Sequence, residues 1–393
     1  MHGTRGIKTA AIAATAILGV TFLAAAATIY VTAGVARAVV TPVRKRKQDQ
    51  AVVDFDDSTR EVTLTDTPDA AVGGRYGLWF ANDSGYARIG DVVDRRHGTV
   101  TRVVDDVLFG DIGSARSARL SGWYYLEPED LGYPVSSVSI ATSLGEAPAW
   151  LIQSEEDTGK WVIQVHGRGA ERQEALRAVS VFRESGYTSL IISYRNDGDA
   201  PESEDRRYGL GGTEWLDVEA GIRFGLERGA QSIVLMGWSM GGAIVLQTAT
   251  RSPSLEKVHG IVLESPVIDW INTLDYQADL MKVPSPIAKG ALRLIESPWG
   301  KPITGLEAAI DFTSMDFVTR ALDLTLPTLI LHSDDDGFVP STASRALAAS
   351  RPDIVTLVPF TEAKHTKLWN YDEVRWNSSI KTWLSQLVEQ QSS

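Results

Sequence analysis

The sequence contains no cysteine, which excludes thiol nucleophiles, disulfide bonds and thiolate metal ligands. It has only six histidines, and no pair of them has the spacing of zinc ligands. Basic residues are also scarce: 38 Lys and Arg face 50 Asp and Glu, and the formal charge of −12 argues against a nucleic-acid-binding protein. No glycine-rich motif for a phosphate or a dinucleotide is complete. We therefore expect no metal, no cofactor and no nucleic-acid partner.

The N-terminal 50 residues differ from the rest in charge, because almost all of their charged side chains are basic. The run Thr9–Ala36 carries no formal charge, and a helix of that length, at about 1.5 Å per residue, exceeds the hydrocarbon thickness of about 30 Å. The basic run Arg44–Lys47 follows it, as expected of a stop at a membrane surface. We therefore predict a transmembrane anchor that binds the lipid bilayer.

A cleaved signal peptide is the alternative, since Ala36-Arg37-Ala38 has the small-x-small form of a cleavage site. With a retained anchor, the protein is expected to be a single-pass protein of the cell membrane. The count of Lys and Arg on the two sides of the span favours a cytoplasmic catalytic domain, whereas a signal-anchor interpretation places that domain outside. The sequence therefore leaves open on which side of the membrane the catalytic domain lies.

Two further patterns follow the anchor at 1–50. Residues 51–135 contain short alternating and aromatic-rich runs separated by Gly, Asp and Pro, which predicts a small β-rich module. Residues 136–393 alternate apolar strands with amphipathic helices, which is typical of a mostly parallel eight-stranded sheet with helices on both faces. The alternation is interrupted over about 266–325, where we expect an insertion that caps the active edge of the sheet. The predicted fold class is therefore α/β.

The run Gly237-Trp-Ser-Met-Gly241 fits the pattern G-x-S-x-G and makes Ser239 a candidate nucleophile. A predicted strand, Ser232–Met236, leads into it and a predicted helix leads out of it, so that a sharp turn would lift the hydroxyl clear of the sheet. This segment resembles the nucleophile elbow of the α/β-hydrolase superfamily. The resemblance extends over about 138–393 and implies the α/β-hydrolase fold.

A serine hydroxyl needs a base and an orienting acid to become a nucleophile. His365 is the only histidine between the last predicted strand, Ile354–Pro359, and the final predicted helix, Glu373–Glu389, and we predict it to be the base. Three adjacent acids, Asp334, Asp335 and Asp336, follow a predicted strand, and chemistry alone does not choose among them. The segment His332–Pro340 resembles the superfamily pattern H-G-x-x-D-x-x-V-P, whose register selects Asp336 as the acid. Asp269 is the alternative, because some superfamily members take their acid after the sixth strand. The order Ser239, Asp336, His365 agrees with the superfamily order.

The predicted strand Trp161–His166 leads into Gly167, and His-Gly at the end of a strand is the form that supplies an oxyanion-hole amide in this superfamily. The resemblance therefore implies that the backbone N–H groups of Arg168 and Met240 stabilise the developing oxyanion.

The resemblance implies a serine hydrolase of the serine-aminopeptidase and monoacylglycerol-lipase-like branch. We expect it to cleave a small-molecule acyl ester, either lipid-like or small, through an acyl-enzyme. The expected anchor would hold it near lipids, and the insertion is rich in apolar residues: Trp270, Leu274, Tyr276, Leu280, Met281, Leu294 and Trp299. A peptidase of the same fold and a non-catalytic binding module are the alternatives, and the sequence does not indicate an oligomeric state.

Overall fold

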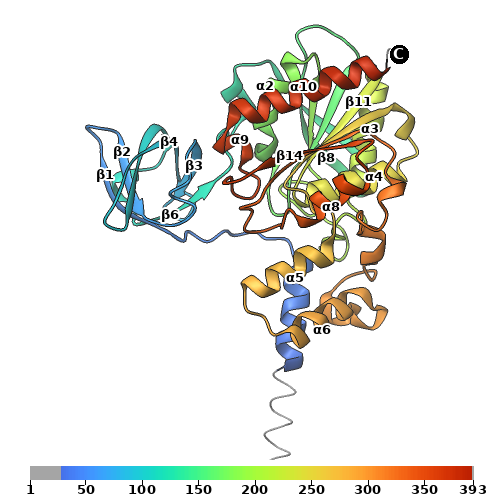
Figure 1. The fold of residues 1–393 in the computed structure, drawn as a ribbon, viewed down its shortest axis with the longest axis horizontal. Coiled ribbons are helices and arrows are strands. Elements are labelled where there is room, and N and C mark those ends of the chain that lie inside the picture. The colour runs from blue at the N-terminus through green and yellow to red at the C-terminus, as the bar shows by residue number, and fades with distance from the viewer. Residues whose placement is uncertain (1–27, 392–393) are drawn as a thin grey trace, which may run out of the picture.

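The computed structural model describes residues 28–391 of the chain. Its strands form two separate sheets, a closed barrel and an open sheet of eight strands. The two sheets lie side by side, with the barrel to the left in Figure 1.

The barrel comes first in the chain and has the strand order β1-β2-β5-β4-β3-β6. Its strands are β1 (Gln50–Asp56), β2 (Glu61–Thr65), β3 (Tyr76–Phe80), β4 (Gly85–Arg96), β5 (Thr99–Phe109) and β6 (Ser117–Ser121). In β2, Val62 and Leu64 are fully buried while their neighbours are half-buried or exposed. This period of two is that of a strand with one face on a core. The predicted β-rich module is thus seen as a closed barrel.

A buried arginine links the loop before β3 to strand β4. Arg102 of β5 is fully buried, and burial lowers its pKa. A buried cation is tolerated only when its donors are satisfied. The Arg102 guanidinium donates to the backbone carbonyl oxygens of Ala70, Val72, Gly74 and Gly90. The loop before β3 is therefore held to strand β5 by hydrogen bonds from Arg102.

The second sheet has the strand order β14-β13-β12-β11-β9-β10-β8-β7. Its strands are β7 (Val135–Thr142), β8 (Gly145–Ile152), β9 (Lys160–Val165), β10 (Thr188–Ile192), β11 (Ser232–Trp238), β12 (Val258–Glu264), β13 (Thr328–Ser333) and β14 (Val355–Phe360). Strand β8 pairs antiparallel with β7 and β10, and the other pairings are parallel. The predicted mostly parallel eight-stranded sheet is therefore confirmed.

Helices cover both faces of the second sheet. They are α2 (Leu176–Glu184), α3 (Trp215–Glu227), α4 (Met240–Arg251), α8 (Thr342–Ser350), α9 (Leu368–Tyr371) and α10 (Glu373–Gln391). On one face, α2 and α10 pack with Val162 and Val234; on the other, α3 and α4 pack with Ile163 and Leu235. Because neighbouring strand residues point to opposite faces, the central strands are apolar along their length.

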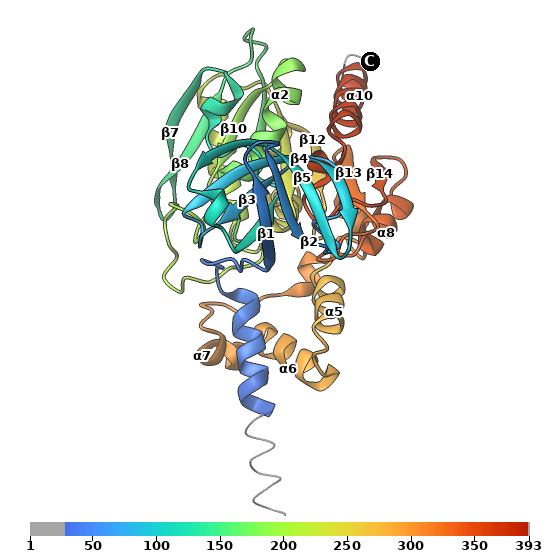
Figure 2. The ribbon, with the colours of Figure 1, turned by 90° about the vertical axis from the view of Figure 1, so that its left-hand side faces the viewer.

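The expected insertion over 266–325 contains three helices. They are α5 (Trp270–Leu280), α6 (Ser285–Glu296) and α7 (Lys301–Thr304). They lie at one end of the sheet beside the N-terminal helix, which is described over residues 28–40 (Figures 1 and 2). Short 3-10 helices occur at Ile112–Ser114, Pro128–Leu131, Arg172–Ala175, Leu255–Lys257, Pro298–Gly300, Phe312–Met315 and Ala321–Asp323.

The transmembrane prediction requires a correction. Most of the expected span Thr9–Ala36 lies outside the described residues. Between residues 28 and 391, no helix is long and apolar enough to cross a bilayer. In the N-terminal helix, Ala36 and Val40 are fully buried against the rest of the protein. The predicted single-pass location in the cell membrane is therefore wrong for the part of the chain that the structure describes.

Candidate active site

Ser239 occupies a sharp turn between β11 and α4. Its φ of 52° lies in the left-handed region, which costs a residue with a side chain on the order of 1–3 kcal/mol. The turn is closely packed: a Cβ at Gly237 would lie 2.4 Å from the carbonyl oxygen of Gly241, and a Cβ at Gly241 would lie 2.2 Å from that of Val165. Only glycine fits at these two positions. The strand, turn and helix expected around Ser239 are all present, and they place the hydroxyl at the carboxyl edge of the sheet.

His365 connects Ser239 to Asp336. Its Nε2 lies 2.9 Å from the Ser239 Oγ, and its Nδ1 lies 2.7 Å from the Asp336 Oδ2. Ser239 follows β11, Asp336 follows β13, and His365 lies in the loop between β14 and α9. The three predicted residues are therefore brought together in one hydrogen-bonded chain at the carboxyl ends of parallel strands.

The carboxylate of Asp336 is held in its ionised form. Its Oδ1 accepts from the backbone N–H groups of Phe338 at 2.8 Å and Val339 at 2.9 Å. Burial by itself raises the pKa of Asp336, but His365 and His332 beside the carboxylate outweigh this effect and hold the pKa well below its usual range. An ionised acid at this position keeps Nδ1 of His365 protonated and leaves Nε2 free to accept a proton.

The other candidate acids have different partners. The side chain of Asp269 caps α5 by accepting from the backbone N–H of Ile271 at 2.8 Å. Asp334 forms an ion pair with Arg345 on the surface. Asp335, also exposed, pairs with Lys364 at 2.6 Å. Of these four acids, Asp336 is the one that reaches His365.

Two backbone amides beside Ser239 are the ones expected to form an oxyanion hole. The loop after β9 passes the nucleophile closely, because a Cβ at Gly167 would lie 3.2 Å from the Ser239 Cβ. The next N–H, that of Arg168, has no acceptor within residues 28–391. The N–H of Met240 begins α4, where a helix offers no internal acceptor. Within residues 28–391, both amides therefore lack a hydrogen-bond acceptor, as an oxyanion hole requires.

Buried acids that the sequence analysis did not identify hold this loop in place. The Gly167 N–H donates to Oε2 of Glu174 at 2.6 Å, and the Gly169 N–H donates to Oδ2 of Asp197 at 3.2 Å. Burial raises the pKa of Asp197, although Tyr208 donates a hydrogen bond that favours its charged form. Asp197 follows β10, and an acid shortly after a buried strand is the signal of this role in the sequence.

A second group of buried charges supports the loop that carries the candidate base. Glu264 at the end of β12 is fully buried, and it accepts from the backbone N–H of Leu368 at 3.1 Å and from the indole N–H of Trp238 at 3.0 Å. Arg177 of α2 donates to the carbonyl oxygen of Thr366 at 2.7 Å. An acid at the end of an apolar strand was the available signal for Glu264, whereas nothing local distinguishes Arg177.

An apolar cavity of about 650 Å³ opens beside Ser239. Its apolar lining includes Val35, Val39, Val43, Met240, Val267, Trp270, Leu274, Met281, Val283, Leu292, Ile295 and Phe338. Of the apolar residues noted in the insertion, Trp270, Leu274 and Met281 line it, whereas Tyr276, Leu280, Leu294 and Trp299 do not. The cavity has the size of a small-ligand site, and its lining suits an apolar group.

Two regions of the sequence match known families. Residues 162–375, more than half of the chain, match the Alpha/beta hydrolase family. Residues 51–121 match a domain of unknown function (DUF8805). No curated protein matches the sequence.

Among solved structures, the esterase Pf2001 of Pyrococcus furiosus resembles this chain in several crystal forms. One form is 18% identical, covers 67% of this chain and 94% of its own, and superposes with a TM-score of 0.52. A second form is 19% identical, covers 67% of this chain and 96% of its own, and also has a TM-score of 0.52. At this level of identity the likeness concerns the fold.

Proposed function

Since the chain belongs to the Alpha/beta hydrolase family, we propose that this hydrolase cleaves carboxylic esters with an apolar acyl group, using Ser239, His365 and Asp336. The observation that carries the proposal is the hydrogen-bonded chain from Ser239 through His365 to Asp336, next to an apolar cavity. A nucleophile, a base and an orienting acid in this arrangement are what acyl transfer requires.

In the proposed reaction, Oγ of Ser239 attacks the acyl carbonyl carbon while Nε2 of His365 takes up the hydroxyl proton. Asp336 stabilises the imidazolium that forms. The carbonyl oxygen becomes an oxyanion that accepts hydrogen bonds from the N–H groups of Arg168 and Met240. His365 then gives its proton to the leaving alkoxide, which departs as the alcohol. Water, deprotonated by the same imidazole, attacks the acyl-enzyme. The bond from the acyl carbon to Oγ then breaks, His365 returns the proton to Oγ of Ser239, and the carboxylic acid is released.

The cavity favours an ester over a peptide as the substrate. A peptide would carry amide groups into the apolar lining, where unpaired polar groups are unfavourable. An aminopeptidase also needs a carboxylate for the α-ammonium group, and Asp275, the only acid on the lining among the described residues, is exposed. The proposal therefore lies nearer to the monoacylglycerol-lipase-like side of the branch than to its aminopeptidase side. We further propose that the insertion over 266–325 is the cap of a catalytic domain at 136–393.

The experiment is covalent labelling with a fluorescent fluorophosphonate, combined with hydrolysis of p-nitrophenyl esters and of aminoacyl p-nitroanilides. We expect the unmodified protein to be labelled and to cleave the esters, and S239A to do neither while its circular dichroism is unchanged. A folded protein that is not labelled and cleaves nothing would point to a non-catalytic module. Cleavage of the anilides without the esters would point to a peptidase.

A further inference from the structure

The N-terminal helix has two apolar sides. Ala36 and Val40 lie one turn apart and are fully buried in the core that also contains α3 and α4. Val35 and Val39, also one turn apart, line the cavity beside the candidate nucleophile. One side of the helix is therefore anchored in the protein, and another side forms a wall of the cavity.

The chain after this helix continues along the cavity, where Val43 and Lys47 also contribute to the lining. We call residues 35–47, the end of the helix and the segment after it, the N-terminal strap. Helices α5 and α6 supply the other helical wall, and α6 packs closely on the N-terminal helix: a Cβ at Gly290 would lie 2.9 Å from the Thr32 methyl carbon. The strap and the insertion thus enclose the cavity together.

The side chain of Arg168 holds the strap. Its Nη2 donates to the carbonyl oxygens of Ala38 at 2.7 Å, Val39 at 3.0 Å and Thr41 at 2.9 Å. The last carbonyls of a helix have no donor within the helix and carry the negative end of its dipole. One guanidinium therefore satisfies the end of the N-terminal helix, while the backbone N–H of the same residue is the one proposed for the oxyanion hole.

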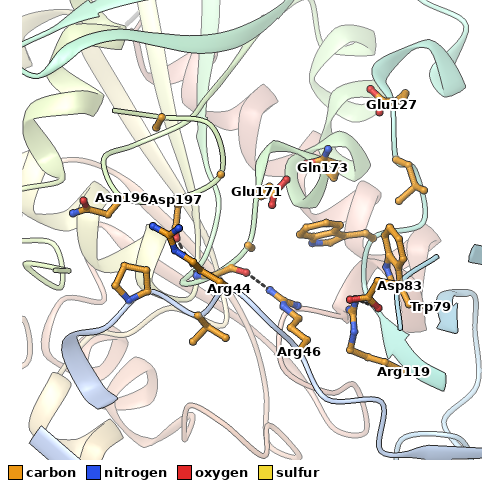
Figure 3. A pocket seen from close by; sticks show the side chains of 18 of the residues that line it. Arg44, Arg46, Trp79, Asp83, Arg119, Glu127, Glu171, Gln173, Asn196 and Asp197 are labelled. Carbon is orange, nitrogen blue, oxygen red and sulfur yellow. Dashed lines mark hydrogen bonds and ion pairs between the residues drawn. The ribbon is translucent and has the colours of Figure 1, made fainter. Parts of the chain in front are cut away.

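The strap in turn holds the loop that contains Arg168. The Nη2 of Arg46 donates to the carbonyl oxygen of Gly169 at 2.6 Å (Figure 3), and the Arg46 guanidinium lies 5.5 Å from the ring centre of Trp123. The Val40 carbonyl accepts from the backbone N–H of Tyr208 at 2.9 Å. Arg168 of the oxyanion loop donates to the strap, and Arg46 of the strap donates to the oxyanion loop. Displacement of the strap would therefore disturb both the cavity wall and the oxyanion loop.

We propose that the N-terminal strap sets the length of the acyl group that the enzyme accepts. Val39 is the specificity-determining residue, because it lines the cavity and its own carbonyl is bound by the guanidinium of Arg168. Arg168 is the positioning residue that holds the strap through its side chain. The inference rests on the proposed function, since an acyl chain attached to Ser239 would extend into the space between the strap and the insertion.

The test compares chain-length selectivity, measured as kcat/KM for p-nitrophenyl decanoate divided by that for the acetate. Val39→Trp fills the cavity, and we expect it to lower this ratio by about tenfold or more. Val39→Ala widens the cavity and should raise the ratio. Val31→Trp is the matched control, because Val31 lies on the same helix, is 47% exposed and does not line the cavity; its ratio should equal that of the unmodified protein.

The outcomes separate this inference from the proposed function. If the unmodified protein is not labelled by fluorophosphonate and cleaves no ester, the proposed function fails. If it cleaves esters and both variants at position 39 keep its selectivity ratio while their melting temperatures show a folded protein, only the inference about the strap is overturned. The alanine variant keeps the test decisive if the tryptophan variant does not fold.

The role of Arg168 is tested with Arg168→Met and Arg168→Lys, which keep the backbone amide. Arg168→Met removes the three hydrogen bonds to the strap, and the basic run Arg44–Lys47 then becomes a faster site of trypsin cleavage. We expect cleavage in this run to accelerate about tenfold and the selectivity ratio to move toward one. Because lysine also donates to carbonyls, Arg168→Lys should restore part of the protection from trypsin and part of the chain-length selectivity. Cleavage rates and ratios equal to those of the unmodified protein would overturn the assignment.

Discussion

The Nε2 of His365 lies 2.9 Å from the Oγ of Ser239, although 126 positions separate the two residues in the chain. Ser239 follows β11 and His365 follows β14, and both strands belong to the parallel part of one sheet. Parallel strands bring their carboxyl ends to the same edge, where loops from distant parts of the chain meet. The chemistry proposed for this protein depends on that meeting point.

The identity of the acid can be tested by replacing each candidate. Asp336→Asn should lower kcat by about 10⁴-fold, because an amide no longer fixes the His365 tautomer that accepts the serine proton. Asp269→Asn should leave kcat within about twofold and the fold intact, because asparagine also caps a helix N-terminus. Steady-state hydrolysis of p-nitrophenyl acetate by both variants provides the measurement, and the reverse pattern would assign the acid to position 269.

Stability in acid should depend on the same carboxylate. The pKa of Asp336 in the folded protein lies below that of an unfolded chain, about 3.9. The ionised carboxylate therefore stabilises the folded state above about pH 4, and this contribution is lost as the pH falls toward the folded-state pKa. In urea unfolding between about pH 5 and pH 3, Asp336→Asn should lose stability less steeply than the unmodified protein. Equal slopes for the two proteins would contradict the depressed pKa.

Arg177 is expected to position the loop of the candidate base. Arg177→Met removes the hydrogen bond to the Thr366 carbonyl, so kcat should fall by about 10–100-fold with little change in KM. The free energy of unfolding should also fall by about 3 kcal/mol, because buried acceptors lose their partner. Arg183→Met on the same helix is the matched control; Arg183 donates at the surface to the Gln153 carbonyl, and its loss should cost about 1 kcal/mol or less. An unchanged kcat in folded Arg177→Met would show that the arginine has no positioning role.

The turn at the nucleophile should not tolerate a methyl group. Gly241→Ala places a Cβ 2.2 Å from the Val165 carbonyl oxygen. Neither atom can rotate away, because the Cβ is bonded directly to the Cα and the oxygen belongs to the backbone. We expect a loss of about 3 kcal/mol or more in the free energy of unfolding. Gly73→Ala is the control, because a Cβ there has no neighbour within 4 Å, and it should change stability by less than about 1 kcal/mol. Thermal and urea unfolding of the two variants would reveal equal stabilities if the contact is unimportant.

Local sequence patterns were sufficient to predict single strands and turns. The apolar run before Gly237 predicted β11, and the glycines around Ser239 predicted the sharp turn, because strand periodicity and turn chemistry act over a few residues. The uncharged N-terminal run was less informative. Apolar residues suit a bilayer or a protein core equally well, and the structure buries Ala36 and Val40 in a core. Composition alone does not distinguish these two environments.

The order of apolar and polar residues by itself determined the α/β class, the eight-stranded sheet and the candidates for nucleophile and base, because each follows from spacing within a short segment. Tertiary structure alone decided that Asp336 and not Asp269 reaches His365, and that Arg168 joins the oxyanion loop to the N-terminal strap. These contacts link segments more than 25 positions apart, so they arise from how strands and helices pack. No local sequence pattern encodes that packing.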